Sequence, residues 1–383
     1  MSAAVLRPAD VSELAEAVGT AAAAGDRLMI RGGGSKDAIG ASTDANRVDM
    51  GALSGIVDYD PAELVLTTRA GTPLAEVQAL VEEQGQMLAF EPFDHGPVFG
   101  RDAGRATIGG VVAAGVAGSQ RVSHGGARDH LLGFEAVSGR GERFVAGGKV
   151  VKNVTGYDLP KLAAGSWGRL FALVEVTLKV LPAPRVRSTY VLEGLSYPAA
   201  QHAMSRALGS QADVAAAAYL PPSGETASRT FFRIQGFAPS VAARGHILER
   251  LLAEDGRLRP LTEAGAAAAW AHFSTFDTLP GSLPLWRINL APSRSVTVIE
   301  HLGRDGEWLA DWGGGLVWLA SDGEPDHIRR AVEHAGGHAT LVRSPDPGAT
   351  TPCFHPQSEG VANLERRIRR AFDPAGVFEA GRF

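Results

Sequence analysis

The sequence has almost no cysteine. Cys353 is the only one among 383 residues, which excludes an internal disulfide, a zinc site built from cysteines and an iron–sulfur cluster ligated by this chain alone. Aromatic residues are also few, at 7%, but the 45% of hydrophobic residues suffices for sizeable cores in two or three domains. We therefore expect an ordinary globular protein of a reducing cytoplasm.

Long apolar runs and an excess of one charge are also missing. No run approaches the roughly 20 residues of a membrane-spanning helix, and Asp10 and Glu13 stand where a signal peptide would need an apolar core. The 42 acidic and 37 basic residues are interspersed, so no basic face invites nucleic acid. We expect no direct membrane insertion; contact with the inner face of a membrane would require partner subunits.

Lysine is rare as well. All five lysines lie between residues 36 and 179, whereas arginine is abundant, and this contrast favours a requirement for a compact ammonium group at some positions. Lys149 and Lys152 stand close together in one segment, and Lys152 is a weak catalytic candidate. Placement of these lysines on the surface is an equally good interpretation.

Glycine, in contrast, is concentrated in two stretches. "DRLMIRGGGSK" (26–36) places Arg31 and three glycines directly after a short strand, and 12 of the 47 glycines fall between residues 101 and 150. Close helix packing explains one glycine-rich stretch alone, but two together can offer several N–H donors to a diphosphate. Neither stretch matches the G-x-G-x-x-G dinucleotide fingerprint, which disfavours a nicotinamide site.

The pattern of elements predicts an α+β fold. Asp10 and Gly25 bracket a helix, strands are expected at 64–71 and 86–92, and Pro73 begins a helix that ends near Gly85. From 186 to 350, strands alternate with helices in an order that suits an antiparallel sheet with helices on one face. Proline-rich connections at 181–185 and 344–352 flank this part, and a last helix is expected at 360–374.

Three motifs resemble the flavin-binding domain of the vanillyl-alcohol-oxidase superfamily, also called the PCMH type. They are the arginine–glycine loop at 31–35, the T-x-G-G helix start at 107–110 and "GSWG" at 165–168. The resemblance covers roughly the first 185 residues. Within the superfamily, segments 125–142 and 150–168 look closest to the smaller flavin-binding subunit of bacterial glycolate oxidase, and "FDPAGVFEAGRF" is similar to its closing segment.

The resemblance implies a domain division and a set of cofactor contacts. A PCMH-type FAD-binding domain of two α/β subdomains would span 1–185, a cap domain with an antiparallel sheet and helices 186–350, and a segment returning to the first domain 351–383. The residues implied to contact FAD are Arg31, Gly32, Gly33, Gly34, Ser35, Lys36, Thr107, Ile108, Gly109, Gly110, Gly115, Gly118, Ser119, Arg121 and Val174. The first loop carries Ser35 where covalent members often have histidine, so the flavin should be non-covalent.

The resemblance also implies partners and a reaction. The chain would join a larger FAD subunit and an iron–sulfur subunit in oxidising a small 2-hydroxy acid, glycolate, to glyoxylate. Trp167 stands where members that oxidise unaided often have glutamate, which puts independent catalysis in doubt. Three hypotheses remain open: an FAD-binding subunit that needs partners, a self-sufficient FAD oxidase of a small hydroxy acid or polyol, and a non-catalytic scaffold.

Other chemistry-bearing residues give weaker signals. Arg287 in "LWRINL" has the chemistry to hold a substrate carboxylate, and His355 in "CFHP" that of a base, although an ion-paired arginine and a structural histidine are the commoner outcomes. His334 and His338 are four apart, but Gly336 and Gly337 between them break the helix that chelation would need. We expect no metal site.

Overall fold

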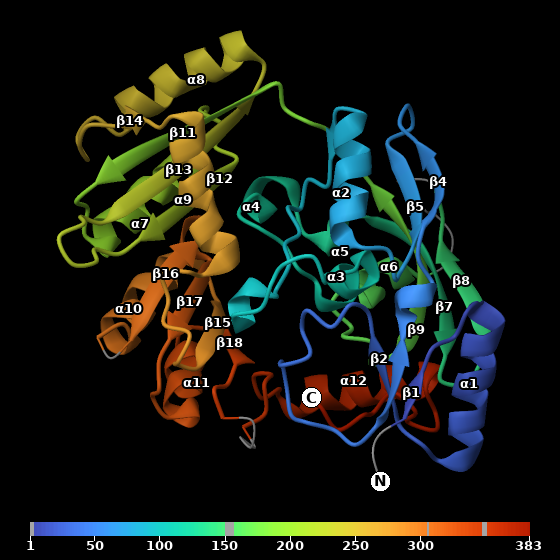
Figure 1. Ribbon diagram of the computed structural model, residues 1–383. Helices are drawn as coiled ribbons and strands as arrows, with labels where there is room; N and C mark the ends of the chain where they lie inside the picture. The colour runs from blue at the N-terminus through green and yellow to red at the C-terminus, as the bar shows by residue number, and fades with distance from the viewer. Residues whose placement is uncertain (1–3, 150–156, 305, 347–350) are drawn as a thin grey trace.

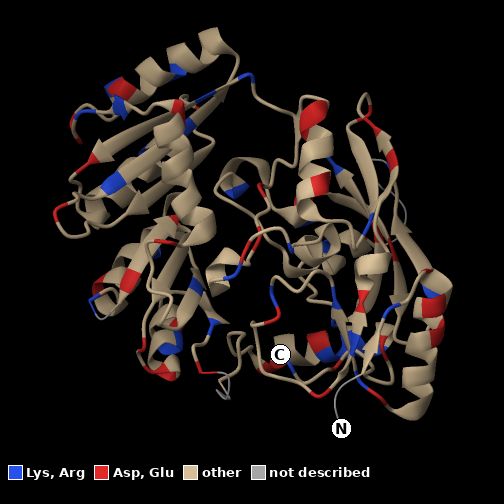
Figure 2. Cartoon of the chain, viewed as in Figure 1, with Lys and Arg blue, Asp and Glu red and all other residues tan. Residues whose placement is uncertain are grey.

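The chain forms two lobes with a junction between them (Figure 1). The computed structural model describes residues 4–149, 157–304, 306–346 and 351–383. We call residues 4–182 together with 351–383 the N-terminal lobe, and residues 186–343 the cap lobe. Both names refer only to the residues that the structure describes. Acidic and basic residues are mixed along both lobes (Figure 2), as their spacing in the sequence indicates.

The N-terminal lobe contains two main sheets. A three-stranded parallel sheet has the order β1–β3–β2, and a five-stranded antiparallel sheet has the order β4–β5–β9–β7–β8. The strands are β1 (Val5–Leu6), β2 (Leu28–Arg31), β3 (Asn46–Asp49), β4 (Ile56–Asp60), β5 (Val65–Arg69), β7 (Leu131–Ser138), β8 (Arg143–Gly147) and β9 (Phe171–Lys179). A short pair, β6 (Gln86–Met87) and β10 (Leu181–Pro182), lies beside them.

Short helices with small residues cover these sheets. The helices are α1 (Val11–Ala24), α2 (Leu74–Glu83), α3 (Ile108–Ala114), α4 (Arg121–His124), α5 (Ala127–His130), α6 (Leu159–Ala163), η1 (Met50–Ala52) and η2 (Pro97–Phe99). Helix α1 begins as predicted, because the Asp10 carboxylate accepts hydrogen bonds from the Ser12 and Glu13 amides, and it ends at Gly25 with a left-handed φ of 75°. The expected strand at 86–92 is wrong beyond Met87, since Glu91 has a positive φ of 46° and Pro92 follows it.

The cap lobe is built on one antiparallel sheet of eight strands in the order β14–β11–β13–β12–β16–β17–β15–β18. Its strands are β11 (Val186–Glu193), β12 (Ala216–Leu220), β13 (Arg229–Gly236), β14 (Arg259–Pro260), β15 (Leu285–Asn289), β16 (Glu307–Asp311), β17 (Leu316–Ala320) and β18 (His338–Arg343). Its helices are α7 (Tyr197–Leu208), α8 (Ala238–Leu251), α9 (Glu263–Thr275), α10 (Ser295–Leu302), α11 (Pro325–His334), η3 (Pro292–Arg294) and η4 (Trp312–Gly314).

The two faces of the cap sheet have different roles, because side chains alternate along each strand. Trp286 and Ile288 pack with α7, α8, α10 and α11 in one core. Leu285 lies on the opposite face, in a second core that includes Ile39 and Val98 of the N-terminal lobe. This second face therefore meets the N-terminal lobe. Helices were expected on one face alone, which is wrong for α9, whose Phe273 packs in the second core.

The end of the chain closes against the N-terminal lobe. After α12 (Glu359–Phe372), the amide of Leu28 donates a 2.8 Å hydrogen bond to the Val377 carbonyl, and the amide of Ala41 donates one of 2.9 Å to the Arg382 carbonyl. The mixed α/β elements and antiparallel sheets confirm the predicted fold class. The connection predicted at 344–352 lies partly outside the described residues, and the proposed boundaries at 185 and 350 stay predictions. Among the residues described, no helix has the length and apolar character to cross a bilayer.

Candidate cofactor site

The two glycine-rich bends of the N-terminal lobe touch each other. A Cβ added to Gly32 would stand 2.1 Å from Thr107 Oγ1, and one added to Gly33 would stand 1.7 Å from the Arg105 carbonyl oxygen. Both separations are far inside van der Waals contact, so these positions require glycine. The first bend, after β2, therefore lies directly against the loop that leads into α3.

The start of α3 depends on close contact as well. Thr107 is the N-cap, with its hydroxyl accepting a 3.3 Å hydrogen bond from the Gly110 amide. The Gly109 amide donates 2.9 Å to the Ala70 carbonyl, and a Cβ on Gly109 would stand 2.5 Å from Ala70 Cβ. The glycine thus lets the helix start sit on the turn that follows β5. These contacts agree with the helix-packing interpretation of this stretch, and the ligand interpretation stays a prediction.

One cavity is lined by both bends. Its wall on this side is formed by Gly32, Gly33, Gly34, Ser35, Lys36, Thr107, Gly109 and Gly110. The amides of residues 32–36 donate no hydrogen bond to any residue that the structure describes, although Gly34 and Ser35 are buried. Buried amides without partners are rare in folded proteins. A ligand with several anionic oxygens fits this row of N–H donors.

The two basic residues of the first bend differ in their ion pairing. Arg31 is paired, with Nε 2.7 Å from Asp37 and a second nitrogen 3.7 Å from Asp49, so it braces the turn. Lys36 has only a 3.4 Å contact with its neighbour Ser35. Burial lowers the pKa of Lys36 to about 8, while the carboxylates of Asp94 and Asp37 raise it. Lys36 is thus the bend's available ammonium group.

Two further segments, far apart in the sequence, also line the cavity. Trp167 and Gly168 of the "GSWG" motif line the cavity together with the last residues of the chain, 378–383. Trp167 has a left-handed φ of 57°, and its ring lies 5.3 Å from that of Phe383 and 5.8 Å from that of Phe354. The sequence did not indicate that individual residues of 378–383 line the cavity. The only indication was the similarity of "FDPAGVFEAGRF" to a closing segment.

Several residues predicted to contact FAD do not line this cavity. Ile108 is buried in the hydrophobic core below α3, and Val174 packs against α1 with its carbonyl accepting a 2.7 Å hydrogen bond from the Ala70 amide. Beside Val174, Phe171 and Leu173 line the cavity. Gly115 ends α3 with a φ of 63°. Their assignment as cofactor contacts stays a prediction.

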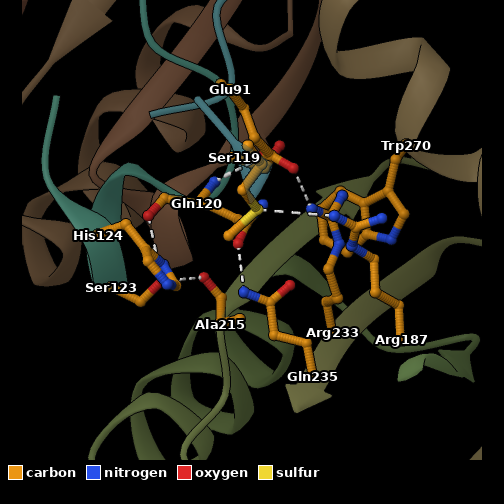
Figure 3. A network of polar contacts seen from close by, with 12 residues as sticks. Glu91, Ser119, Gln120, Ser123, His124, Arg187, Ala215, Arg233, Gln235 and Trp270 are labelled. Atoms are coloured by element: carbon orange, nitrogen blue, oxygen red, sulfur yellow. Dashed lines mark hydrogen bonds and ion pairs between the residues drawn. The ribbon is translucent and has the colours of Figure 1, made fainter. Parts of the chain in front are cut away.

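Gly118, Ser119 and Arg121 lie at the junction with the cap lobe, around α4. Ser119 Oγ donates to Asp311 at 2.7 Å, and Trp312 Nε1 donates to the Gly118 carbonyl at 3.0 Å. Figure 3 shows the neighbouring part of this junction, where Glu91 and Arg233 point toward each other beside Trp270. These three predicted cofactor contacts thus touch cap-lobe side chains.

The weak catalytic candidates lie on different elements. Arg287 projects from β15 on the face that meets the N-terminal lobe, whereas His355, in the segment before α12, accepts a 3.3 Å hydrogen bond at Nδ1 from the Ala339 amide of β18. Lys152 lies outside the described residues. His334 ends α11 and His338 begins β18, and no cluster of three or more potential metal ligands occurs among the described residues.

Sequence reasoning missed His95 and Asp94. The Asp94 carboxylate accepts hydrogen bonds from the amides of Gly104, Arg105 and Ala106, and so fixes the loop that meets Gly33. His95 is buried, stacked on Phe93 at 4.7 Å, and its Nδ1 has no partner among the described residues. No motif marked either residue; the acid in "FDHG" was the only signal.

Comparison with known proteins places the chain in a family. Glycolate oxidase subunit GlcE of Escherichia coli strain K12 is 37% identical over 99% of both chains. The chain belongs to the GlcE family. Residues 2–147 match the family model described as "FAD binding domain". Glycolate oxidase subunit GlcD of Bacillus subtilis strain 168 is 29% identical over 36% of this chain and 27% of its own length.

The fold of this GlcE-family chain also occurs in a solved structure of alkyldihydroxyacetonephosphate synthase. The two superpose with a TM-score of 0.67 over 97% of this chain and 76% of the other, at 14% sequence identity. The predicted membership of the FAD-binding superfamily is confirmed by the family model and the GlcE match, and FAD as the cofactor is supported by the same findings.

Proposed function

We propose that this chain binds FAD non-covalently between its two glycine-rich bends and acts as the FAD-binding subunit of a complex that oxidises glycolate. The observation that carries the proposal is the row of unpartnered amides at residues 32–36, which faces a cavity shared with Thr107 and Gly110. The relative named as a glycolate oxidase subunit supports the choice of substrate.

The bends would hold the diphosphate of FAD. Gly32, Gly33, Gly34 and Ser35 offer main-chain donors, and Lys36 offers a positive charge. Bound FAD supplies two-electron redox chemistry with a hydroxy acid. The chain itself binds, orients and shields. Ser35 in the first bend, and the absence of cysteine from the sequence near the second, support non-covalent binding.

Partner subunits would complete the reaction. The single cysteine, Cys353, is buried, so this chain cannot ligate an iron–sulfur cluster by itself. We infer that a larger flavin subunit and an iron–sulfur subunit receive the electrons. The chain would act in the cytoplasm, and those partners would bring it to the inner face of the membrane. The word "subunit" in the names of the relatives GlcE and GlcD supports an assembly.

The test of FAD binding uses a cavity glycine at which an added Cβ would meet no backbone atom within 4 Å. Gly110 lines the cavity, and a Cβ there would meet only Thr107 Oγ1, at 3.1 Å. Gly110→Leu should therefore fill the cavity without disrupting the backbone contact, and should abolish stoichiometric FAD in the purified protein. Gly360→Leu is the matched control, because Gly360 is an exposed helix position with nothing within 4 Å of its Cβ.

The absorption spectrum and the melting temperature decide the outcome. Full flavin in Gly110→Leu, or a colourless wild type that ignores added FAD, would contradict the proposal. Dye reduction with glycolate by the isolated chain would favour a self-sufficient oxidase. If Gly110→Leu lost its flavin and still restored full activity to the complex, the chain would be a scaffold.

A further inference from the structure

Trp312 holds a strained position at the junction of the lobes. Its backbone is left-handed, with a φ of 55°, which is costly for a bulky residue. The Asp311 carboxylate accepts a 2.7 Å hydrogen bond from the Trp312 amide, and Trp312 Nε1 donates to Gly118 of the N-terminal lobe at 3.0 Å. The indole ring is thereby fixed between the lobes. Backbone strain of this kind is common at ligand sites, but it needs further observations to indicate one.

Two guanidinium groups share this one ring. Arg121 Cζ, from α4, lies 4.5 Å from the centroid of the Trp312 ring, and Arg287 Cζ, from β15, lies 5.4 Å from it. Each lobe thus contributes one arginine. Both guanidinium groups lie within cation–π distance of the indole.

Neither arginine has a carboxylate partner. Among the described residues, no acid lies within ion-pair distance of Arg121 or Arg287, and the hydrogen bond of Arg287 goes to the neutral amide oxygen of Asn289 at 2.7 Å. Arg287 is partly buried, and burial together with the charge of Arg121 lowers its pKa to about 10. Two neighbouring cations without an acid are costly unless an anion joins them.

An unpartnered buried group lies near Arg287. His95 is 7% exposed and its Nδ1 has no hydrogen-bond partner among the described residues. Burial lowers the pKa of His95 well below its usual value, and the charges of Lys36 and Arg287 lower it further. The imidazole is therefore neutral at neutral pH and adds no further positive charge beside Arg287. Its Nδ1 is a buried polar atom without a partner near that arginine.

We propose that Arg121 and Arg287, stacked on Trp312, bind the carboxylate of the small acid substrate between the two lobes. The inference rests on the proposed function. A carboxylate can accept paired hydrogen bonds from guanidinium groups, and the pair would bring the substrate to the junction where Gly118 and Ser119 lie. The same chemistry would suit a cofactor phosphate, but the amides of residues 32–36 and the ammonium group of Lys36 already offer donors to the diphosphate in a cavity that neither arginine lines.

The experiment measures two dissociation constants on the full-length chain. Glycolate binding is followed by isothermal titration calorimetry, with ethylene glycol as the probe without a carboxylate, and FAD binding by flavin fluorescence. Arg287→Leu should weaken glycolate binding at least tenfold and change FAD binding less than twofold, and Arg121→Leu should weaken glycolate binding by a similar factor. The glycolate affinity of Arg287→Lys should fall between those of wild type and Arg287→Leu, because lysine keeps the positive charge but cannot form the paired hydrogen bonds of a guanidinium group. Arg294→Leu, at an exposed arginine of the cap, is the control and should match wild type.

The outcomes separate this inference from the proposed function. Unchanged glycolate affinity in the folded variants, wild-type binding of ethylene glycol equal to that of glycolate, or a tenfold loss confined to FAD would each overturn the carboxylate site. If wild type binds no FAD while the two variants still lose glycolate, the proposed function fails and the site stands. Melting temperatures show that the variants are folded.

Discussion

Ser119 and Asp311 form a 2.7 Å hydrogen bond across 192 positions of sequence, from the loop before α4 to the end of β16. Both side chains are buried, and the second Asp311 oxygen accepts from the amide of the strained Trp312. One carboxyl group thus joins the lobes and fixes the residue on which Arg121 and Arg287 stack. The state of this group should affect how firmly the lobes meet.

Protonation of Asp311 is expected to tune stability. Burial raises its pKa to about 7, while the hydrogen bonds from Ser119 and from the Trp312 amide lower it. A folded pKa above the unfolded value of 3.8 means that the folded state binds the extra proton, so the contribution of Asp311 is complete below about pH 4 and is lost as the pH rises through 7. Glu91 raises the pKa further and Arg233 opposes it.

Asp311→Asn, which imitates the protonated acid, removes this dependence. The melting temperature of the variant relative to wild type should rise between pH 5 and pH 8, by about 2 to 4 °C for each 1 kcal/mol involved. Thermal unfolding monitored by circular dichroism at both pH values measures the difference, with Asp322→Asn at an exposed loop as control. A difference that is the same at both pH values would show that Asp311 does not titrate in this range.

The pair of Glu91 and Arg233 should carry more stability than a surface pair. The Arg233 side chain is only 8% exposed, stacks on Trp270 at 4.1 Å and forms an ion pair with Glu91, whose other oxygen accepts from the Gln120 amide (Figure 3). Glu91→Ala leaves the arginine charge largely buried without a partner. We expect destabilisation toward the low end of about 3–5 kcal/mol, because Glu91 itself is 28% exposed.

Chemical denaturation and one double variant test this expectation. Glu91→Ala combined with Arg233→Met should be more stable than Glu91→Ala alone, since the unpaired charge is gone. The control is Glu193→Ala in the exposed pair with Arg259, where about 1 kcal/mol or less is expected. Equal losses of unfolding free energy in Glu91→Ala and Glu193→Ala would mean that the ion pair at the junction contributes no more stability than a solvent-exposed pair.

The sequence indicated local elements wherever one strong signal dominated. Asp10 and Gly25 bracket α1 because a cap and a left-handed glycine act within a few residues, and "LWRINL" is a strand because its alternation matches the two faces of a sheet. The strand expected at 86–92 ends at Met87, and Glu91, whose backbone is left-handed, contacts Gln120 and Arg233, which are distant in sequence. Local propensity carries no information about such contacts.

The features of the candidate site likewise divide into those that the sequence indicated and those that it did not. The two glycine bends were visible because clustered glycines favour turns and close approach of the backbone, and their mutual contact follows from the positions of Gly32, Gly33 and Thr107. The pairing of Arg121 with Arg287 was not visible. It depends on the cap sheet turning one face toward the N-terminal lobe and on a single indole between them, and both depend on the packing of the whole chain.

Cys353 should be unreactive in the folded protein. It is 2% exposed, and burial raises the pKa of its thiol to about 11, so the reactive thiolate is scarce at pH 8. Ellman's reagent should therefore label no thiol rapidly in native buffer and one thiol per chain in guanidinium chloride. Ser223→Cys, at an exposed turn, should add one fast-reacting thiol as a positive control. Rapid labelling of wild type would show that the core around Cys353 opens readily.

FAD binding should weaken at alkaline pH through Lys36. In the free chain the pKa of Lys36 is about 8, so above that pH the amine must regain a proton before it can meet an anionic phosphate. The dissociation constant for FAD, measured by fluorescence quenching, should rise between pH 8 and pH 9.5 by at most about tenfold per pH unit.

Lys36→Met should bind FAD about tenfold or more weakly at pH 7, as expected for a lost charge-assisted hydrogen bond, and its affinity should vary little between pH 8 and pH 9.5. Lys161→Met, which removes a more exposed lysine outside the cavity lining, should follow wild type. Parallel pH curves for wild type and Lys36→Met would assign the alkaline loss to another group.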